Sequence, residues 1–555
     1  MQIRQHVGAD KPAVILHPSG TVVSFDELEA RANRLAHRFR RAGLREGDAV
    51  AILMENNEHI HAVMWAARRS GLYYVPINTC AGLGEHLRAG PPELLILAGP
   101  EGCLTGWEPY PQCVADQPDT AIDDDLEGDL LQYSSGTTGR PKGVRLTHGA
   151  WTYTASAIDA LNVLGPADLN FLWLPLAHAF GKVMLSLPLL IGFPTAIDGR
   201  VDRIVDNLAE LHPTVMGAAP RIFEKAHARI EQMVAEQGGL KKAVFDWSIG
   251  VGLKVSASRQ AGRQPALLSR LAYQLADRLV FSTIRERFGG RIRFFVSAAA
   301  ALDRNVAQWF DAIGITVLEG YGLTETAAAS FINRPNAYRF GTVGWPFPAT
   351  EAKIATDGEI LLRGPGLMTS YHDLPEATEE ALDHDGWFHT GDIGEIDADG
   401  YLRITDRKKD MFKTSQGKYV APAAIQVRFK GLCPYAGELI VVGEAKPYCV
   451  ALVSLDSEAI TEWAAGHGLA GKSFAELTRD PKTRELIAGY IDTLNAELNR
   501  WEQIKKFAVL DRELSIESGD LTPSMKLRRK VVLDKSADEI SALYQQPAGQ
   551  APKSG

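Results

Sequence analysis

The stretch YSSGTTGRPKGV, residues 133–144, decides how the rest of the chain is interpreted. It gathers hydroxyl side chains, glycines and the single lysine Lys142 directly after the short apolar run Leu130–Leu131. Glycines let backbone N–H groups converge, while Ser, Thr and Lys supply further donors and a positive charge, as phosphate binding requires. The residue order of a Walker A loop is absent. A loop of this composition is by itself more often a turn, so phosphate binding needs support from elsewhere in the chain.

On both sides of this stretch, strand-like and helix-like patterns alternate. Ser24 and Glu27 have the spacing of a helix capping box. Strand, helix and strand patterns then follow one another at 48–77, 194–216 and 292–318. Alternation of this kind predicts an α/β fold with parallel sheets covered by helices.

The predicted secondary-structure pattern changes twice further along the chain. Residues 230–287 have a helical pattern, in which leucines recur four residues apart, and we interpret them as a helical layer of the main domain. These leucines are Leu267, Leu271, Leu275 and Leu279. After Gly341 the pattern becomes short strands joined by Asp-Gly turns, which predicts a β-rich subdomain.

A charged segment, Asp406–Asp410, marks the predicted domain boundary. We expect a large N-terminal domain at 1–408, a small, mobile α+β C-terminal domain at 409–544, and a disordered polar tail at 545–555.

Composition and charge exclude several classes of protein for this chain. The chain has 555 residues, of which 45% are hydrophobic and 23% charged, and its net charge of -9 argues against a dedicated nucleic-acid binder. Five cysteines without a C-x-x-C pair are typical of a reducing compartment. No apolar run reaches membrane-spanning length, and the first residues show no signal-peptide pattern. We therefore predict a cytoplasmic enzyme and leave open a peripheral contact with the inner face of the membrane.

Further motifs turn the phosphate-binding hypothesis into a family resemblance. Together with 133–144 they resemble, in order, the signature motifs of the adenylate-forming superfamily of acyl-CoA synthetases, luciferases and peptide-synthetase adenylation domains. The additional motifs are LPLAH at 174–178, EGYGLTE at 319–325, GWFHTGD at 386–392, DRKKD at 406–410 and LTPSMK at 521–526.

The resemblance implies ATP, Mg²⁺ and coenzyme A as cofactor or co-substrates. It implies catalytic roles for Lys526, Glu325, Thr324 and His178, with Glu325 also holding the magnesium ion. It implies nucleotide- or coenzyme-binding roles for Ser134, Ser135, Gly136, Thr137, Thr138, Gly139, Lys142, Gly320, Tyr321, Gly322, Asp392, Arg407 and Gly417.

Each of these residues has a simpler interpretation when it is taken alone. Glu325 could cap a helix at 326–331, Asp392 could be a turn residue, His178 a core histidine and Lys526 a solvated basic residue. Only their joint order favours the catalytic interpretation.

The segments 387–422 and 275–293 resemble the long-chain fatty acyl-CoA synthetase branch. The resemblance therefore implies a long-chain fatty acid:CoA ligase of lipid metabolism that acts through an acyl-adenylate. An acyl-AMP ligase that passes the acyl group to a carrier protein is the alternative, and a non-catalytic nucleotide-binding relative is a third interpretation. Neither the chain length of the substrate nor the oligomeric state can be read from the sequence.

Two departures from the family pattern raise structural questions. The segment that usually reads SGGAPL is SAAAAL at 297–302, which is costly only where glycine served a positive φ angle. The chain also looks shortened between residues 78 and 130, as if a strand and a helix of the N-terminal region were missing.

Overall fold

The computed structural model describes most of the 555 residues. The described residues are 6–8, 10–54, 56–77, 94–98, 108–110, 114, 117–122, 129–133, 142–515, 518–522 and 526–545.

A nine-stranded sheet forms the centre of the large domain, and its middle strands run parallel. Only the strands at its two ends, β2 and the pair β14 and β15, are antiparallel to their neighbours. In spatial order the strands are β15 (Trp345–Pro346), β14 (Phe331–Ile332), β13 (Val317–Tyr321), β12 (Phe294–Ser297), β11 (Val215–Ala218), β9 (Asn170–Leu172), β10 (Thr195–Ile197), β1 (Pro12–Leu16) and β2 (Val22–Ser24).

A second, seven-stranded sheet carries the strand that precedes the 133–144 stretch and the strand at its end. It contains β18 (Ser370–Tyr371), β8 (Gly143–Thr147), β7 (Asp129–Tyr133), β4 (Tyr73–Ile77), β3 (Ala49–Met54), β5 (Leu94–Ala98) and β6 (Glu108–Pro109). The strands β4, β3, β5 and β6 are parallel, as the alternating pattern predicts. Most of the region 78–130 lies outside the described residues, so the predicted shortening there stays a prediction.

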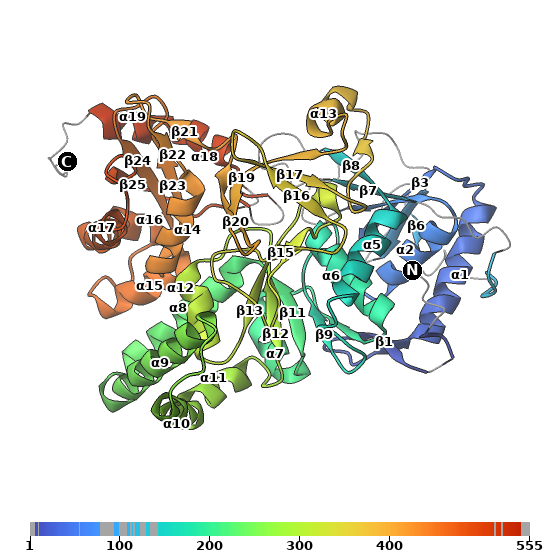
Figure 1. The fold of residues 1–555 in the computed structure, drawn as a ribbon, viewed down its shortest axis with the longest axis horizontal. Coiled ribbons are helices and arrows are strands. Elements are labelled where there is room, and N and C mark those ends of the chain that lie inside the picture. The colour runs from blue at the N-terminus through green and yellow to red at the C-terminus, as the bar shows by residue number, and fades with distance from the viewer. Residues whose placement is uncertain are drawn as a thin grey trace.

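Helices cover both sheets and separate them (Figure 1). The helix α5 packs against β8 and α6, and α6 packs against β9 and β11, so these two helices form a layer between the sheets. The predicted cap of α1 is confirmed, since Oγ of Ser24 accepts from the N–H of Glu27 at 3.2 Å. The helices are α1 (Phe25–Arg41), α2 (His59–Arg69), α5 (His148–Asp159), α6 (Ala179–Ile191), α7 (Ile204–Leu211), α8 (Pro220–Gln237), α9 (Gly239–Gln260), α10 (Leu267–Ala276), α11 (Ser282–Arg287) and α12 (Arg304–Ala312).

The predicted β-rich subdomain is an antiparallel sheet of four strands. These are β16 (Glu351–Ile354), β17 (Glu359–Arg363), β19 (Phe388–Ile396) and β20 (Leu402–Arg407), with α13 (Pro375–Ala381) between β18 and β19. Glycines at the predicted Asp-Gly turns have positive φ, for example Gly358 at 87° and Gly400 at 85°. Figure 1 shows this sheet between the small domain and the N-terminal part of the chain.

The small domain, orange to red in Figure 1, follows β20 and has a hydrophobic core of its own. Its three-stranded sheet is β23 (Ala436–Val442), β24 (Cys449–Leu455) and β25 (Ile504–Val509), in which β25 runs parallel to β24. The other elements are β21 (Phe412–Lys413), β22 (Tyr419–Val420), α14 (Pro422–Leu432), α15 (Ser457–Gly466), α16 (Phe474–Arg479), α17 (Pro481–Asn495), α18 (Arg529–Lys535) and α19 (Ala537–Gln545).

Ion pairs join the small domain to the large one. Nζ of Lys225 on α8 lies 2.9 Å from the carboxylate of Asp456, which caps α15. Arg229 on the same helix pairs with Glu462 of α15. Polar contacts of this kind are typical of interfaces between domains that can move relative to each other.

The leucine stripe of residues 267–279 is helical but does not pack into the domain. Its leucines are each more than half exposed to solvent, together with Leu268. The helix α10 packs on α9 through its other side, where Ala276 is fully buried, and Phe281 is buried just beyond its end. The expected helical layer is present, and the leucine stripe lies on its solvent-facing side, because a four-residue spacing identifies one face of a helix but not what covers it.

No helix in the described part of the chain is long and apolar enough to cross a membrane.

Candidate active site

Asp392 is the buried centre of a polar cluster. It lies on β19 opposite Arg407 on β20, and Nε of Arg407 lies 3.1 Å from Oδ1 of Asp392. The hydroxyl of Tyr321, at the end of β13, donates to Oδ2 at 2.6 Å. Burial raises the pKa of Asp392, and the charge of Arg407 and the Tyr321 hydrogen bond act against that rise. Asp392 is therefore a strand residue with two partners, not a turn residue, and its carboxylate can accept further hydrogen bonds.

Glu325 lies in a short 3₁₀ turn, Thr324–Thr326, and the alternative helix at 326–331 does not form. The hydroxyl of Tyr371 on β18 donates to Oε1 of Glu325 at 2.8 Å. Nζ of Lys142 lies 4.3 Å from the centre of the Tyr371 ring, within the range of a cation–π contact. Tyr371 thus links a cation of the 133–144 stretch to the carboxylate of the 319–325 motif.

Lys526 lies in a tight turn of the small domain that faces the large domain. Its backbone N–H donates to Oγ1 of Thr522 at 3.0 Å, and its carbonyl accepts from the N–H of Thr522 at 2.8 Å. Burial, followed by the charge of Arg407, lowers the pKa of Lys526 to about 8, although Asp392 and Glu325 act in the opposite direction. The structure therefore places this amine within the electrostatic reach of both acidic residues.

His178 is the N-cap of α6, where its Nδ1 accepts a hydrogen bond from the N–H of Phe180 at 3.2 Å. Burial lowers its pKa to about 3, and the charge of Lys526 contributes to the same effect. The imidazole is therefore neutral at ordinary pH, and it is close enough to Lys526 to interact with it.

The glycines of the motifs differ in what they do. A Cβ at Gly322 would lie 2.0 Å from the carbonyl oxygen of Ala328, so only glycine fits there. Gly320 on β13 lines the apolar pocket described below. Gly417 has a φ of 76° in a turn of the small domain and lies in open space, with no described contact to the other site residues.

The rest of the predicted phosphate-binding loop lies outside the described residues. This applies to Ser134, Ser135, Gly136, Thr137, Thr138 and Gly139. Lys142, at the end of the loop, is described.

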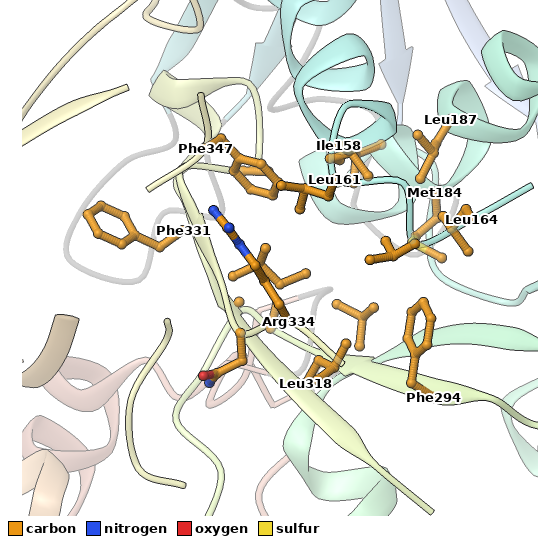
Figure 2. A pocket seen from close by; sticks show the side chains of 18 of the residues that line it. Ile158, Leu161, Leu164, Met184, Leu187, Phe294, Leu318, Phe331, Arg334 and Phe347 are labelled. Carbon is orange, nitrogen blue, oxygen red and sulfur yellow. The ribbon is translucent and has the colours of Figure 1, made fainter. Parts of the chain in front are cut away.

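An apolar pocket adjoins the polar cluster, and Figure 2 shows it from close by. Its empty volume is about 730 Å³, including the opening to solvent. Side chains from α5, α6, β12, β13 and β14 line it, among them Ile158, Met184, Phe294, Leu318 and Phe331. Tyr321 lines the pocket as well, and its hydroxyl binds Asp392.

The residues of the site fit a magnesium ion that arrives with a nucleotide. In the described part of the chain no three His, Cys, Asp or Glu side chains form a metal cluster. Magnesium is commonly bound by one or two carboxylates together with substrate phosphates, and Glu325 supplies one carboxylate near the cation Lys142. This donor set suits a nucleotide-bound magnesium ion better than a cage made by the protein alone.

Tyr371 is the site residue that the sequence did not reveal. It lies outside every motif, on a two-residue strand that pairs with β8. A lone tyrosine carries no spacing signal, so only the pairing of β18 with β8 shows that it reaches Glu325.

Comparison with known proteins assigns the chain to a family. The family described as "AMP-binding enzyme" matches residues 2–90 and 101–372, and the family described as "AMP-binding enzyme C-terminal domain" matches residues 409–548. The chain belongs to the AMP-binding enzyme family.

Among similar curated proteins is the long-chain-fatty-acid–CoA ligase FadD15 of Mycobacterium bovis, 36% identical over 75% of this chain and 69% of that protein. Long chain acyl-CoA synthetase 6 of Arabidopsis thaliana is 33% identical over 76% of this chain and 61% of that protein. Fatty acyl-CoA synthetase A of Dictyostelium discoideum is 30% identical over 94% of this chain and 86% of that protein.

Solved structures of similar fold include the adenylation domain of a carboxylate reductase from Mycobacterium chelonae, with a TM-score of 0.75 and 21% identity over 98% of this chain and 90% of that chain. ATP-bound MatB from Rhodopseudomonas palustris has a TM-score of 0.70 and 23% identity over 96% of each chain. At this level of identity, the two structures confirm the fold.

Proposed function

We propose that the chain is an ATP-dependent, AMP-forming ligase that joins a long-chain fatty acid to coenzyme A. Of the relatives named above, the one at 36% identity is named a long-chain-fatty-acid–CoA ligase, the one at 33% a long chain acyl-CoA synthetase, and the one at 30% a fatty acyl-CoA synthetase. The alternative, transfer of the acyl group to a carrier protein, has no such support.

One structural observation carries the proposal: Tyr321 belongs both to the apolar pocket and to the polar cluster. A long acyl chain needs an apolar site, and most of the side chains that line this pocket are apolar. A nucleotide needs polar partners, and the hydroxyl of the same tyrosine binds Asp392 of the polar cluster.

In the proposed first step, a carboxylate oxygen of the fatty acid attacks the α-phosphorus of ATP, and the bond to pyrophosphate breaks. Thr137, Thr138 and Lys142 would hold the β- and γ-phosphates, and Glu325 would hold Mg²⁺, which neutralises phosphate charge when it is bound. Lys526 would bridge the carboxylate and the α-phosphate. Fixed positive charge placed where negative charge develops is the main source of rate in such reactions.

The nucleotide base would stack on Tyr321, and Asp392 and Arg407 would bind the ribose hydroxyls. In the proposed second step, the thiolate of coenzyme A attacks the acyl carbon of the adenylate, and AMP leaves with the bonding electrons. The coenzyme would enter near Gly417. Neither step needs a nucleophile from the protein, since both nucleophiles are substrates.

The acceptor is tested directly by giving the enzyme hexadecanoic acid, ATP and Mg²⁺ with either free coenzyme A or a phosphopantetheinylated carrier protein. Acyl-CoA formation with free coenzyme A supports the proposal. Acylation of the carrier protein without acyl-CoA formation would support the alternative.

The enzyme would act in the cytoplasm with peripheral contact to the inner face of the membrane, and the exposed leucines of α10 suggest the surface involved. Basic residues surround these leucines: residues 254–291 contain eight Lys or Arg and two Asp or Glu, although the whole chain has a net charge of -9. Arg270 and Arg278 are exposed on the same segment. Exposed leucines with flanking cations are typical of surfaces that bind anionic bilayers.

Vesicle co-sedimentation tests this contact. Replacing both Leu271 and Leu275 by Asp should abolish binding to phosphatidylglycerol vesicles, and raised salt should weaken binding of the unchanged protein. Val22→Asp, a surface change on the edge strand β2, is the control and should bind normally. Unchanged binding of the double variant, or a dimer that only this variant disrupts, would contradict the membrane contact.

A further inference from the structure

Arg334 is the single charged side chain among the described residues that line the apolar pocket. It follows β14, and its backbone is fixed by two hydrogen bonds with Ala337, at 3.2 Å and 2.9 Å. Figure 2 shows its side chain within the pocket, among the labelled apolar residues that include Phe331 and Phe347. A guanidinium group therefore lies where an unsubstituted acyl chain would offer it only methylene groups.

The guanidinium of Arg334 has few partners. Its Nε is buried and makes no hydrogen bond, and within the described residues no carboxylate lies within 4.0 Å of the group. The guanidinium lies over the ring of Trp345, whose centre is 5.3 Å from Cζ. By contrast Arg339, five residues later, pairs with both Asp397 and Asp399.

A buried N–H group without an acceptor is costly, because it has lost water without gaining a hydrogen-bond partner, and Nε of Arg334 is such a group. An acceptor supplied by the substrate would remove this cost. The planar N–H groups of arginine match a carboxylate best, and each can also donate to a hydroxyl or carbonyl oxygen.

We infer that Arg334 forms a second recognition point in the acyl pocket, and that the preferred substrates are fatty acids carrying a further oxygen group on the chain, above all a second carboxylate. This inference rests on the proposed function and specifies its substrate class. An unsubstituted fatty acid binds the same pocket but leaves Arg334 without its acceptor.

The experiment compares kcat/KM for pyrophosphate release with four acids of equal length: hexadecanoic acid, its terminal hydroxy derivative, its terminal dicarboxylic derivative and a mid-chain hydroxy acid. The proteins are the unchanged enzyme, Arg334→Met, which keeps an unbranched side chain without the guanidinium group and its charge, and Arg334→Lys. Arg479→Met, the same chemical change at an exposed site of the small domain, is the matched control.

The unchanged enzyme should prefer at least one oxygenated acid over hexadecanoic acid by about 10-fold to 100-fold, the range of a hydrogen bond to a charged group. Arg334→Met should remove that preference and leave or raise the rate with hexadecanoic acid, which also shows that the variant is folded. Arg334→Lys should keep part of the preference, and the control should keep all of it.

Equal kcat/KM for all four acids with the unchanged enzyme would overturn the inference, and so would a common loss for all acids in Arg334→Met. A change confined to the KM for coenzyme A would assign Arg334 to that substrate instead and would also overturn it. If hexadecanoic acid is activated without any preference, only this inference fails. If no fatty acid supports pyrophosphate release, the proposed function itself fails.

Discussion

The hydroxyl of Tyr321 donates a 2.6 Å hydrogen bond to Asp392, so the wall of the apolar pocket and the polar cluster share one buried contact. The same carboxylate meets Arg407 on its other oxygen at 3.1 Å. The contact fixes the orientation of a side chain that we propose binds ribose.

Tyr321→Phe should therefore raise the KM for ATP by about 10-fold, because a buried charged acceptor loses one hydrogen bond. Asp392→Asn should raise it more, since it also leaves Arg407 without its charge partner. Steady-state kinetics with varied ATP check both. An unchanged KM for ATP in Asp392→Asn would exclude the ribose-binding role.

The protonation of Lys526 should make the adenylation rate depend on pH. Its pKa is lowered to about 8, and the amine must carry its proton to stabilise negative charge, so activity is full below that value and falls as the pH rises through it. We expect kcat/KM for adenylation to decline above about pH 8 in the unchanged enzyme.

Lys526→Ala should lower the adenylation rate by about 10²–10³ at neutral pH. Lys526→Arg should retain part of the activity without the decline near pH 8, since arginine stays protonated. Acyl-adenylate formation by Lys526→Ala at the normal rate would show that the lysine is wrongly assigned.

The hinge segment links the two proposed half-reactions. Asp406, at the end of β20, accepts from the N–H of Ala423 at 3.0 Å and so connects this strand to α14. The next residues form a turn in which the N–H groups of Asp410 and Met411 donate to the carbonyl of Arg407. Lys409 lies in this turn, and within the described chain its own N–H has no acceptor.

Lys409→Pro would therefore cost no native hydrogen bond but would restrict rotation at residues 408 and 409. The structure places Lys526 within the electrostatic reach of Asp392 and Glu325, the arrangement proposed for adenylation. The variant should keep most of its adenylation activity and lose thioester formation, which separate timing of the two half-reactions would show. Lys409→Ala is the control and should retain both. Equal losses in the two steps of Lys409→Pro would exclude a pivot at this residue.

Ala299 stands where the resembling family has its second glycine, and its φ is 75°. A Cβ in this left-handed region costs about 1–2 kcal/mol, while glycine costs about 0.5–1 kcal/mol through the entropy of the unfolded chain. Ala299→Gly should therefore stabilise the large domain by up to about 1 kcal/mol. Ala300→Gly, at an adjacent exposed residue without positive φ, should destabilise it by about 0.5–1 kcal/mol. Thermal unfolding of both variants checks whether each substitution stabilises or destabilises the fold. A lower melting temperature for Ala299→Gly would contradict backbone strain at Ala299.

The sequence predicted the fold well where its signals were local. Strand and helix patterns at 48–77 correspond to β3, α2 and β4. Alanines at 298–299, where the resembling family has glycines, raised the possibility of a positive φ, and Ala299 has one. The sequence could not predict features that depend on tertiary contacts. Tyr371 meets Glu325 only through strand pairing, and the leucine spacing of α10 could not show that this face lies in solvent.

Exchange of labelled pyrophosphate into ATP tests the central claim most directly, because it reports acyl-adenylate formation without coenzyme A. We expect exchange that requires both Mg²⁺ and a long-chain fatty acid and that falls by about 10²–10³ in Lys526→Ala. Exchange supported only by acetate or by amino acids would contradict the substrate class. Absence of exchange with every acid would instead indicate a nucleotide-binding protein without this activity.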